Sequence, residues 1–374
     1  MIFEVQFLKR HWIKPIVPVV ILLILGYGNF VGGYTLGYQQ IWKSHSHTSA
    51  IIFWVLLAFC QVTFLFYWGL IIIVGPGKLK NLPLIDIYNS GDNDMITPPP
   101  AYFPCDQYGF PYFDSHTGSI MAPRSFYLKD AGYIVLKFDH YCVWVGSVIG
   151  QNNYLYFMKF IIWFWLFFVL FIVYLSVYSK NIDNINPNLI VAFIICGFWL
   201  LILLAFIIVH LKYTFINMTT LDEVTIKQYN QYQRFKLRNQ NLKVKKTRIP
   251  RKEDGLRYIN VAHDNTRLVI SYSIHDRIYN MGFKKNWINL IFNGNKNQNY
   301  QGNYDNITLL KAFILFLLPY VDLYCLKFIN NNDNLNPYQY FSDNYNEEFL
   351  KLIDEKVKNR LCYLPLYIKP EQSQ

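Results

Sequence analysis

The sequence predicts an all-α integral membrane protein, with four transmembrane helices, a small loop-rich cytosolic insert between helices 2 and 3, and a cytosolic C-terminal tail. Only 16% of the 374 residues are charged, against about 25% in typical soluble proteins. Four apolar stretches each approach the ~20 residues that a helix needs to cross a bilayer. Basic residues are concentrated outside these stretches, and their distribution sets the expected orientation.

The first apolar stretch is too long for the core of a secretory signal peptide, and no small-residue cleavage site follows it. Lys159 is the single Lys or Arg within a span and lies near the start of the third. We therefore expect its amine to extend toward the lipid headgroups. The four predicted spans are 15–37, 50–75, 155–178 and 189–209.

The charge distribution predicts that both chain ends and the insert face the cytosol. Of the 35 Lys and Arg residues, 24 lie in the tail from residue 210, and most of the others lie in the N-terminus and the insert. The two remaining connections carry one each, so the positive-inside rule favours this orientation. The expected organisation is an N-terminus over 1–14, helices 1 and 2 over 15–75, a catalytic insert over 76–154, helices 3 and 4 over 155–209, and a basic tail over 210–374.

The insert is too long for a simple connection and is rich in glycine and proline, which favours a small module of short pieces against the membrane. Within it, Tyr133–Phe138 is predicted to form a short strand. In the tail, the basic run 224–252 suits either attraction to anionic lipid or a solvated linker. The apolar run 307–319 is short for a fifth span and suits an interfacial or buried helix. The Asn-rich segment 293–306 is expected to be a loop.

The six cysteines include no C-x-x-C pair, and the four outside the spans are expected on the reducing cytosolic side, which argues against disulfides. Asp139, His140 and Cys142 place an acid, an imidazole and a thiol within four residues. A neighbouring imidazole can take a proton from a thiol, and a carboxylate can orient the imidazole, as in covalent catalysis. The alternative is an ordinary loop cysteine, because such a short string also occurs by chance.

This stretch resembles the signature of the DHHC protein acyltransferases, in the DHYC form that some fungal members have, with Tyr141 in third place. Further partial matches follow in the family's order along the chain. Before the signature, Pro123-Arg124 fits a P-x-R region. After it come Trp144, Gly150, Asn153 and Phe157, then Thr219-Thr220-Leu221-Asp222 for the T-T-x-E motif, and then Tyr279-Asn280-Met281-Gly282 with Asn286-Trp287 for the C-terminal motif.

The resemblance implies a protein S-palmitoyltransferase that works in two steps. Cys142 takes a long-chain acyl group from palmitoyl-CoA, with His140 as base and Asp139 as its orienting partner, and passes it to membrane-proximal cysteines of other proteins. Thr219, Thr220 and Asp222 are expected near the active site, or as a helix cap. Asn286 is expected to be a buried organiser of the C-terminal segment. Arg124 and Lys137 are candidates for steering the CoA phosphates.

The family's cysteine-rich module holds two structural zinc ions, and the sequence departs from it here. The eight corresponding positions contain no Cys or His, so no bound cofactor is expected and the zinc sites are expected to be lost, with an apolar core in their place. These positions are Asp114, Thr117, Tyr127, Leu128, Ala131, Ile134, Tyr141 and Val148.

Two other function classes are open from the sequence. A catalytically inactive membrane scaffold would fit the missing zinc ligands, although Asp139, His140 and Cys142 are present. A channel or transporter fits poorly, because the spans contain almost no ionisable residues. Nucleic-acid binding is not expected, since the basic run lacks an aromatic platform. The expected partners are acyl-CoA, substrate proteins and the lipid bilayer, in an endomembrane or the plasma membrane.

Overall fold

The computed structural model describes eight ranges of the chain: 16–88, 94–179, 186–239, 255–264, 266–292, 308–320, 340–341 and 345–366. Its internal contacts divide the chain into two units, which are described separately. Unit 1 comprises residues 1–76, 140–212 and 310–322, and unit 2 comprises residues 77–139, 213–309 and 323–374. The N-terminal residues 1–14, the Asn-rich segment 293–306 and the second half of the basic run lie outside the described residues.

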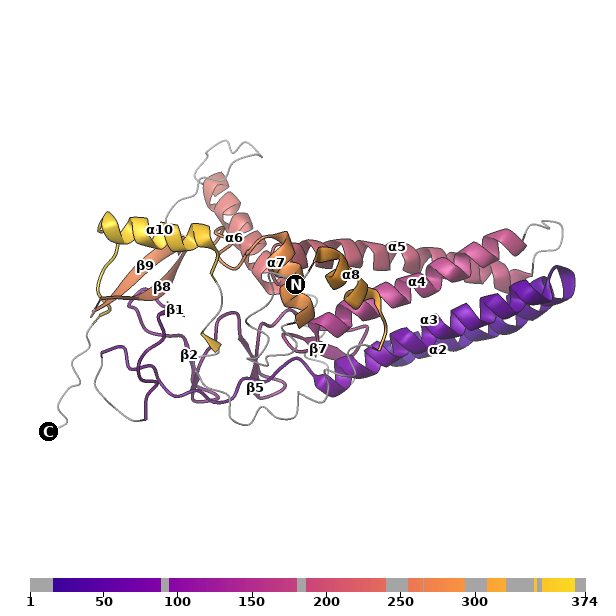
Figure 1. Cartoon of the computed structure of the whole chain (residues 1–374), viewed down its shortest axis with the longest axis horizontal. Helices are drawn as coiled ribbons and strands as arrows, with labels where there is room; N and C mark the ends of the chain where they lie inside the picture. The colour runs from indigo at the N-terminus through magenta and orange to yellow at the C-terminus, as the bar shows by residue number, and fades with distance from the viewer. Residues whose placement is uncertain are drawn as a thin grey trace. The chain divides into compact units, whose positions relative to one another are not determined.

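Unit 1 is built on four long apolar helices, each long enough to cross a membrane, as predicted. They run side by side along much of their length (Figure 1). The first is α2 (Ile16–Phe30), which continues through the π-helical turns of η1 (Val31–Trp42). The others are α3 (His47–Val74), α4 (Tyr154–Tyr178) and α5 (Pro187–Phe215), whose last residues pass into unit 2.

Aromatic side chains form the contact between α3 and α4. The ring of Phe64 lies 4.7 Å from that of Phe164 and 5.5 Å from that of Phe167. At the first helix, a Cβ on Gly37 would overlap the indole of Trp54, so only glycine allows η1 and α3 to approach this closely. Packing of large rings and close backbone approach therefore hold this bundle together.

Lys159 does not extend toward the headgroups, so that prediction was wrong. Its side chain is only 2% exposed, and its amine donates hydrogen bonds to the carbonyls of Leu315 and Leu318, at 3.3 and 3.4 Å. These carbonyls lie at the C-terminal end of α8 (Leu309–Leu317), the helix that the short apolar run of the tail forms. The terminal carbonyls of a helix carry partial negative charge, so the buried cation stabilises the end of α8 within unit 1.

Strands are the main departure from the predicted all-α class. The described part of the insert contains seven short strands, and the described part of the tail adds two longer ones that were not predicted. In unit 2, β1 (Tyr102–Cys105), β8 (Leu256–His263) and β9 (Thr266–Ser273) form an antiparallel sheet in the order β1-β8-β9. Unit 2 also contains two separate two-stranded hairpins. One pairs β2 (Phe113–Asp114) with β3 (Ser119–Ile120), and the other pairs β4 (Phe126–Leu128) with β5 (Tyr133–Val135). The predicted strand at 133–138 corresponds to β5.

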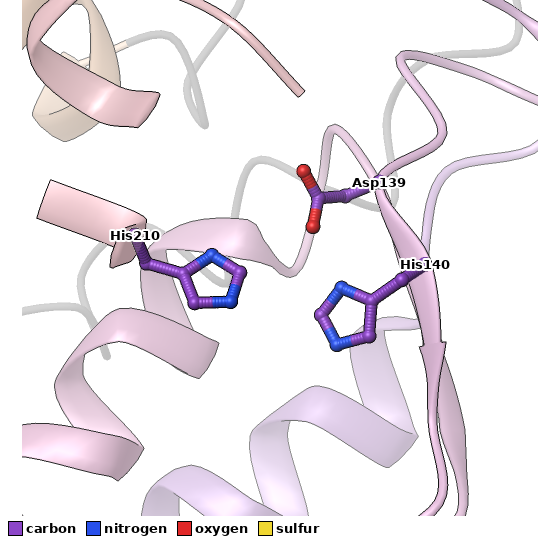
Figure 2. A group of neighbouring side chains, drawn as sticks. All are labelled: Asp139, His140 and His210. Carbon is purple, nitrogen blue, oxygen red and sulfur yellow. The ribbon is translucent and has the colours of Figure 1, made fainter. Parts of the chain in front are cut away.

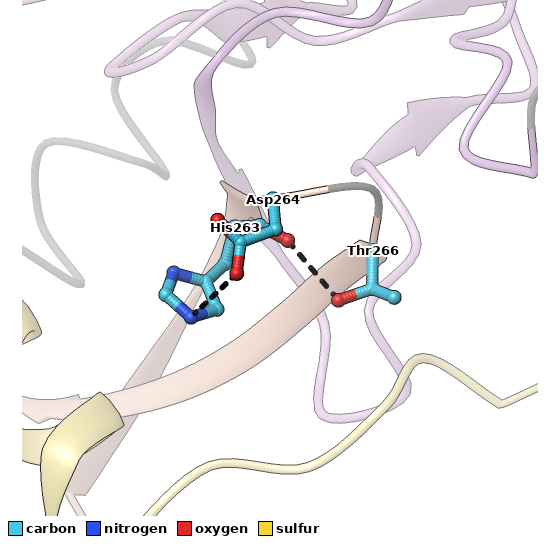
Figure 3. Close-up of polar contacts among 3 residues, drawn as sticks. All are labelled: His263, Asp264 and Thr266. Carbon is cyan, nitrogen blue, oxygen red and sulfur yellow. Dashed lines mark hydrogen bonds and ion pairs between the residues drawn. The ribbon is translucent and has the colours of Figure 1, made fainter.

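The β8–β9 hairpin ends in a tight turn that polar contacts hold closed. The hydroxyl of Thr266 donates to the carbonyl of His263 at 3.1 Å, and the His263 ring lies 3.5 Å from the carboxylate of Asp264 (Figure 3). Asp264 has a φ of +50°, a conformation that aspartate tolerates better than most residues. The turn signal was present in the sequence, but the strands beside it are interrupted by polar residues.

A buried polar group supports the sheet of unit 2. The guanidinium of Arg267 donates to Asn260 at 2.6 Å and to the carbonyl of Pro100 at 2.8 Å, and it lies over the ring of Phe103. Burial lowers the pKa of Arg267 to about 10. Around this group, buried apolar side chains such as Ile120 and Ile134 form a contiguous core.

Among its described residues, unit 2 also has the helices α6 (Thr220–Asn239), α7 (Phe283–Phe292) and α10 (Glu347–Lys358). The side chain of Asn346 accepts a hydrogen bond from the amide of Phe349 at 2.7 Å and so caps α10. Phe349 and Ile353 of α10 pack against Ile259 and Ile270 of the sheet (Figure 1). The amphipathic α10 therefore covers one face of the sheet.

Candidate active site

A hairpin in unit 1 carries Cys142 and His140. Its strands are β6 (His140–Cys142) and β7 (Ser147–Ile149), and Cys142 is paired with Ser147. Gly146 turns the chain between them with a φ of +74°, which glycine adopts without strain, and its amide donates to the carbonyl of Cys142 at 2.9 Å. Side chains alternate along a strand, so His140 and Cys142 share one face, and Tyr141 takes the other.

Buried polar side chains fix this hairpin to the helices. The indole of Trp68 in α3 donates to the carbonyl of Val145 at 3.1 Å. Asn153, which is fully buried, donates to the carbonyls of Ile71 and Val148 at 3.2 and 2.8 Å and accepts from the amide of Gly150 at 2.9 Å. The start of α4, the end of α3 and strand β7 are thereby joined through one amide side chain.

The cysteines differ in their surroundings. Cys60 and Cys196 lie within the long helices and act there as small apolar residues. Burial raises the pKa of the Cys105 thiol, with Asp106 acting in the same direction and Arg267 opposing it, so this thiol is held in its protonated form. Cys142 is also largely buried, but it alone among these shares a strand face with an imidazole.

The imidazole of His140 is surrounded by rings. Phe157 of α4 lies edge-on to it, with centroids 5.3 Å apart, and His210 of α5 lies 5.6 Å away. Figure 2 shows the two histidine rings facing each other, with Asp139 at the residue before His140. Sequence reasoning did not identify His210. The available signal was a single histidine near the end of an otherwise apolar helix, which usually means no more than an interfacial residue.

Asp139, which is almost fully buried, is held by Thr220. Its two carboxylate oxygens accept hydrogen bonds from the amide and the hydroxyl of Thr220, both at 2.8 Å. The neighbouring Thr219 does something different: its hydroxyl accepts from the amide of Asp222 while Asp222 accepts from the amide of Thr219, each at 3.1 Å. This reciprocal pair is a capping box at the start of α6. The motif therefore combines a cap with a contact to the candidate site.

Asn286 joins α7 to the end of α5. Its amide donates to the carbonyl of Phe215 and to the side chain of Asn280, both at 2.7 Å, and its oxygen accepts from the amide of Met281 at 3.1 Å. Asn286 is only 3% exposed, so each of these bonds replaces water. The contacts of Asn286 are thus with the chain around it, and they fix the segment that follows the fourth span.

Arg124 and Lys137 bind the protein itself. Both donate to the side chain of Asn217, at 3.2 and 2.9 Å, and the guanidinium of Arg124 lies 4.0 Å from the ring centre of Tyr279. Asn217 in turn donates to the carbonyl of Tyr279 at 2.8 Å. These contacts fix the segment before α6 and give the two cations a structural role in unit 2. Their interaction with the CoA phosphates stays a prediction.

Four of the eight positions that the resemblance assigns to zinc ligands pair with one another across two hairpins. Tyr127 faces Ile134 in the β4–β5 register, and Tyr141 faces Val148 in the β6–β7 register. In the β2–β3 turn, the carboxylate of Asp114 accepts from the amide and the hydroxyl of Thr117, at 2.9 and 2.8 Å. None of these pairs offers the sulfur or nitrogen ligands that structural zinc takes.

His140 and His210 offer two nitrogen ligands, whereas a structural zinc site takes four. We therefore assign no structural zinc to these two side chains.

Unit 1 also contains a narrow apolar pocket among its helices, which is partly open to the outside. Residues of α2, α4 and α5 line it, and nearly all are hydrocarbon or aromatic: Ile24, Leu25, Tyr27, Gly28, Phe167, Phe168, Phe171, Ala192, Ile195 and Cys196. A row of rings leads toward it from the hairpin, since Trp144 lies 5.1 Å from Trp199, and Trp199 stacks 6.3 Å from Phe168.

Four membrane-spanning helices, a hairpin with a thiol and an imidazole on one face, and an apolar pocket are typical of a membrane-bound acyltransferase. Comparison of the sequence with known proteins supports the same class. Residues 109–227 match the family model described as DHHC palmitoyltransferase. "Palmitoyltransferase PFA5" of Candida albicans is 40% identical over 390 residues, covering 98% of this chain and 96% of the relative.

More distant relatives carry similar descriptions. "Palmitoyltransferase PFA5" of Candida glabrata is 30% identical over 227 residues, covering 59% of this chain and 64% of the relative. "Probable protein S-acyltransferase 13" of Arabidopsis thaliana is 26% identical over 178 residues, covering 44% of this chain and 58% of the relative. The chain belongs to the DHHC palmitoyltransferase family, and it is a multi-pass membrane enzyme with protein S-palmitoyltransferase activity that uses an acyl-CoA donor.

Proposed function

We propose that Cys142 carries the acyl group, that His140 acts as its general base and that Asp139 orients the base. The observation that carries this assignment is the β6 strand, which gives His140 and Cys142 a common face. The two hydrogen bonds from Thr220 keep the Asp139 carboxylate in one orientation, and so support its role beside His140. We propose that Thr219 and Asp222 form the helix cap that positions Thr220. Asn286 fixes the end of α5, which precedes this cap in the chain.

In the first step, His140 takes the proton of the Cys142 thiol, and the thiolate attacks the carbonyl carbon of the acyl-CoA thioester. The bond from this carbon to the CoA sulfur breaks, a bond to the Cys142 sulfur forms, and CoA leaves with the proton from His140. In the second step, His140 takes the proton of a substrate thiol, which attacks the acyl-Cys142 thioester. Cys142 leaves as thiolate and recovers that proton.

The apolar pocket of unit 1 is proposed to hold the acyl chain while it is attached to Cys142. Trp144 follows Cys142 by two residues, and its ring contact with Trp199 leads to Phe168 in the pocket lining. Each buried methylene contributes about 0.8 kcal/mol, so a long chain gains most of its binding free energy from such a lining. This accounts for an active-site hairpin fixed directly to the membrane helices.

We also propose that the module folds without zinc. The backbone pairs Tyr127–Ile134 and Tyr141–Val148 hold hairpins at positions where the family uses metal ligands. Ile134 is buried in the core of unit 2, and His116 stacks on Tyr127 with centroids 5.0 Å apart. Strand pairing and apolar packing thereby replace metal coordination, in a DHYC variant of the family.

The proposed orientation places both termini, the insert 76–154 and the tail from 210 in the cytosol, in keeping with the distribution of basic residues. The proposed substrates are proteins whose cysteines lie close to the cytosolic surface of an endomembrane or the plasma membrane. At that surface a substrate thiol can meet an acyl-enzyme whose chain remains in the bilayer.

The catalytic assignment is tested by labelling cells with an alkyne analogue of palmitate. The protein, Cys142→Ala and a matched control, Cys362→Ala, are compared before and after hydroxylamine, which cleaves thioesters. We expect hydroxylamine-sensitive label on the protein and on Cys362→Ala, and none on Cys142→Ala. Undiminished label on Cys142→Ala would contradict the assignment, and an absence of label from all three would favour an inactive relative.

A further inference from the structure

The C-terminal tail returns to the membrane-spanning helices through α8. From Leu310 onward this helix belongs to unit 1, together with the four long helices, although a long stretch of the tail separates it from α5. Figure 1 shows it beside α4. With nine residues α8 is too short to cross a bilayer, which takes about 20. Its place beside spanning helices therefore depends on contacts made by its own side chains and carbonyls.

Lys159 of α4 makes the polar contact with α8. Its side chain is almost fully buried and donates to the carbonyls of Leu315 and Leu318, at 3.3 and 3.4 Å. The same amine lies 5.5 Å from the ring centre of Tyr67 in α3 and 6.0 Å from that of Phe316 in α8. A cation within a membrane protein needs such partners, and the carbonyls at the end of a helix carry partial negative charge. Lys159 therefore links α3, α4 and α8.

Tyr320, which follows α8, indicates how deep the segment reaches. Its hydroxyl lies 3.2 Å from that of Thr63 in α3, and its ring centre lies 5.0 Å from that of Phe66. Thr63 is eleven residues before Val74, the last residue of α3. That separation is about 16 Å along a helix, whereas the hydrocarbon core of a bilayer is about 30 Å thick. The segment therefore runs well inside the core beside α3.

The two faces of α8 differ in exposure and are both apolar. Ala312 and Phe316 are buried. The outer face consists of Leu310, Ile314 and Leu317, which are 49 to 70% exposed. These residues are four and three positions apart, so they lie on one side of the helix. A contiguous apolar face of this kind marks a contact with another protein or with lipid.

We propose that α8 is embedded in the bilayer, with Lys159 as its anchor to α3 and α4 and with its outer face in contact with lipid acyl chains. The argument for lipid is continuity: α3 spans the membrane, and its exposed side chains, such as Val62, are apolar as well. The outer face extends this lipid-facing surface at the same depth. The tail is thus held in the membrane by a segment that enters the bilayer, in addition to the four spans. This role is independent of the catalytic assignment.

The test is photolabelling of the full chain in phosphatidylcholine nanodiscs that contain a phosphatidylcholine with a diazirine in its acyl chain. Mass spectrometry of peptides then locates the labelled residues. We expect label on the outer face of α8 at a level similar to that on Val62 of α3, and no label on Ala312 or Phe316 of the same helix. Label on Val62 with none on the outer face would overturn the proposal, because water or protein would then cover that face.

The anchor is tested by Lys159→Met, which removes the cation with little change in side-chain length. We expect the label on the outer face to fall severalfold while Val62 keeps its label. Tyr320→Phe, which loses only the hydroxyl contact with Thr63, should lower the label less. Lys311→Met replaces an exposed lysine of α8 itself, and this matched control should leave the labelling unchanged. Native labelling of the outer face in Lys159→Met would overturn the role of Lys159 as the anchor.

Discussion

The β6–β7 and β4–β5 hairpins have the same construction and different tasks. Each pairs two three-residue strands, and each brings two of the family's zinc-ligand positions into register: Tyr141 with Val148 in one, Tyr127 with Ile134 in the other. We propose that backbone pairing substitutes for metal in both. Only the first hairpin is also fixed by buried polar side chains, through Trp68 and Asn153. We infer that strand pairing and apolar packing are enough to fold the β4–β5 hairpin. The β6–β7 hairpin has directional hydrogen bonds in addition, because they fix the position of the Cys142 thiol.

Among the variants that test this comparison, replacement of Asn153 is expected to have the largest effect on the acylation rate. Asn153→Leu removes three hydrogen bonds and leaves the carbonyls of Ile71 and Val148 and the amide of Gly150 without that partner. We expect the acylation rate to fall about a hundredfold, equivalent to about 3 kcal/mol. The measurement is single-turnover acylation by the purified protein. Asn260→Leu is the matched control, because Asn260 is equally buried and its side chain donates to the carbonyl of Gly109 and accepts from Arg267 in unit 2. Equal loss of rate in both variants would contradict a special role of the β6–β7 hairpin.

The two adjacent threonines sharpen the comparison within one motif. Thr220→Val removes the hydroxyl hydrogen bond to Asp139 and keeps the one from the backbone amide, with little change of volume, and we expect acylation to slow about tenfold. Thr219→Val removes the cap of α6 instead, which costs about 1 kcal/mol of stability and leaves the acylation rate within about threefold. Acylation rates and thermal unfolding are measured for both. If Thr219→Val slows acylation more than Thr220→Val, the proposed link from Thr220 to Asp139 is wrong.

The smallest expected effect is that of removing metal. A module held by strand pairs and apolar packing should contain no stoichiometric zinc, and a strong chelator should change neither its unfolding temperature nor its acylation rate. Elemental analysis of the purified chain gives the metal content, and a zinc-containing member of the family serves as the chelator-sensitive control. Two zinc ions per chain, or loss of activity with chelator, would show that packing has not replaced the metal.

Much of unit 1 could be predicted because apolar length is a direct physical signal. The four spans follow from hydropathy, but the first and the last run further than predicted. The first continues through η1 to Trp42, and the last runs from Pro187 past Lys212 to Phe215. The β8–β9 hairpin was missed because polar residues break its alternation, and Arg267 and Asn260 are in fact buried in the sheet. Lys159 was misjudged because its partners, the carbonyls at the end of α8, lie more than 150 residues away in sequence.

In the candidate site, too, some residues could be predicted from the sequence and others could not. Asp139, His140 and Cys142 were identified from their neighbourhood in sequence, and the β6 strand explains how two of them share a face. His210 and Tyr154 carry no local signal, because their proximity depends on how α4 and α5 pack. Sequence could indicate the chemistry, whereas the second imidazole required the structure.

The most direct test of the account is mass spectrometry of the purified protein after brief reaction with palmitoyl-CoA in detergent. The account predicts one added palmitoyl group, on the peptide that contains Cys142, released by hydroxylamine and lost when a thiol substrate is added. Palmitate found instead on Cys105, Cys362 or another cysteine, with the Cys142 peptide unmodified, would contradict it.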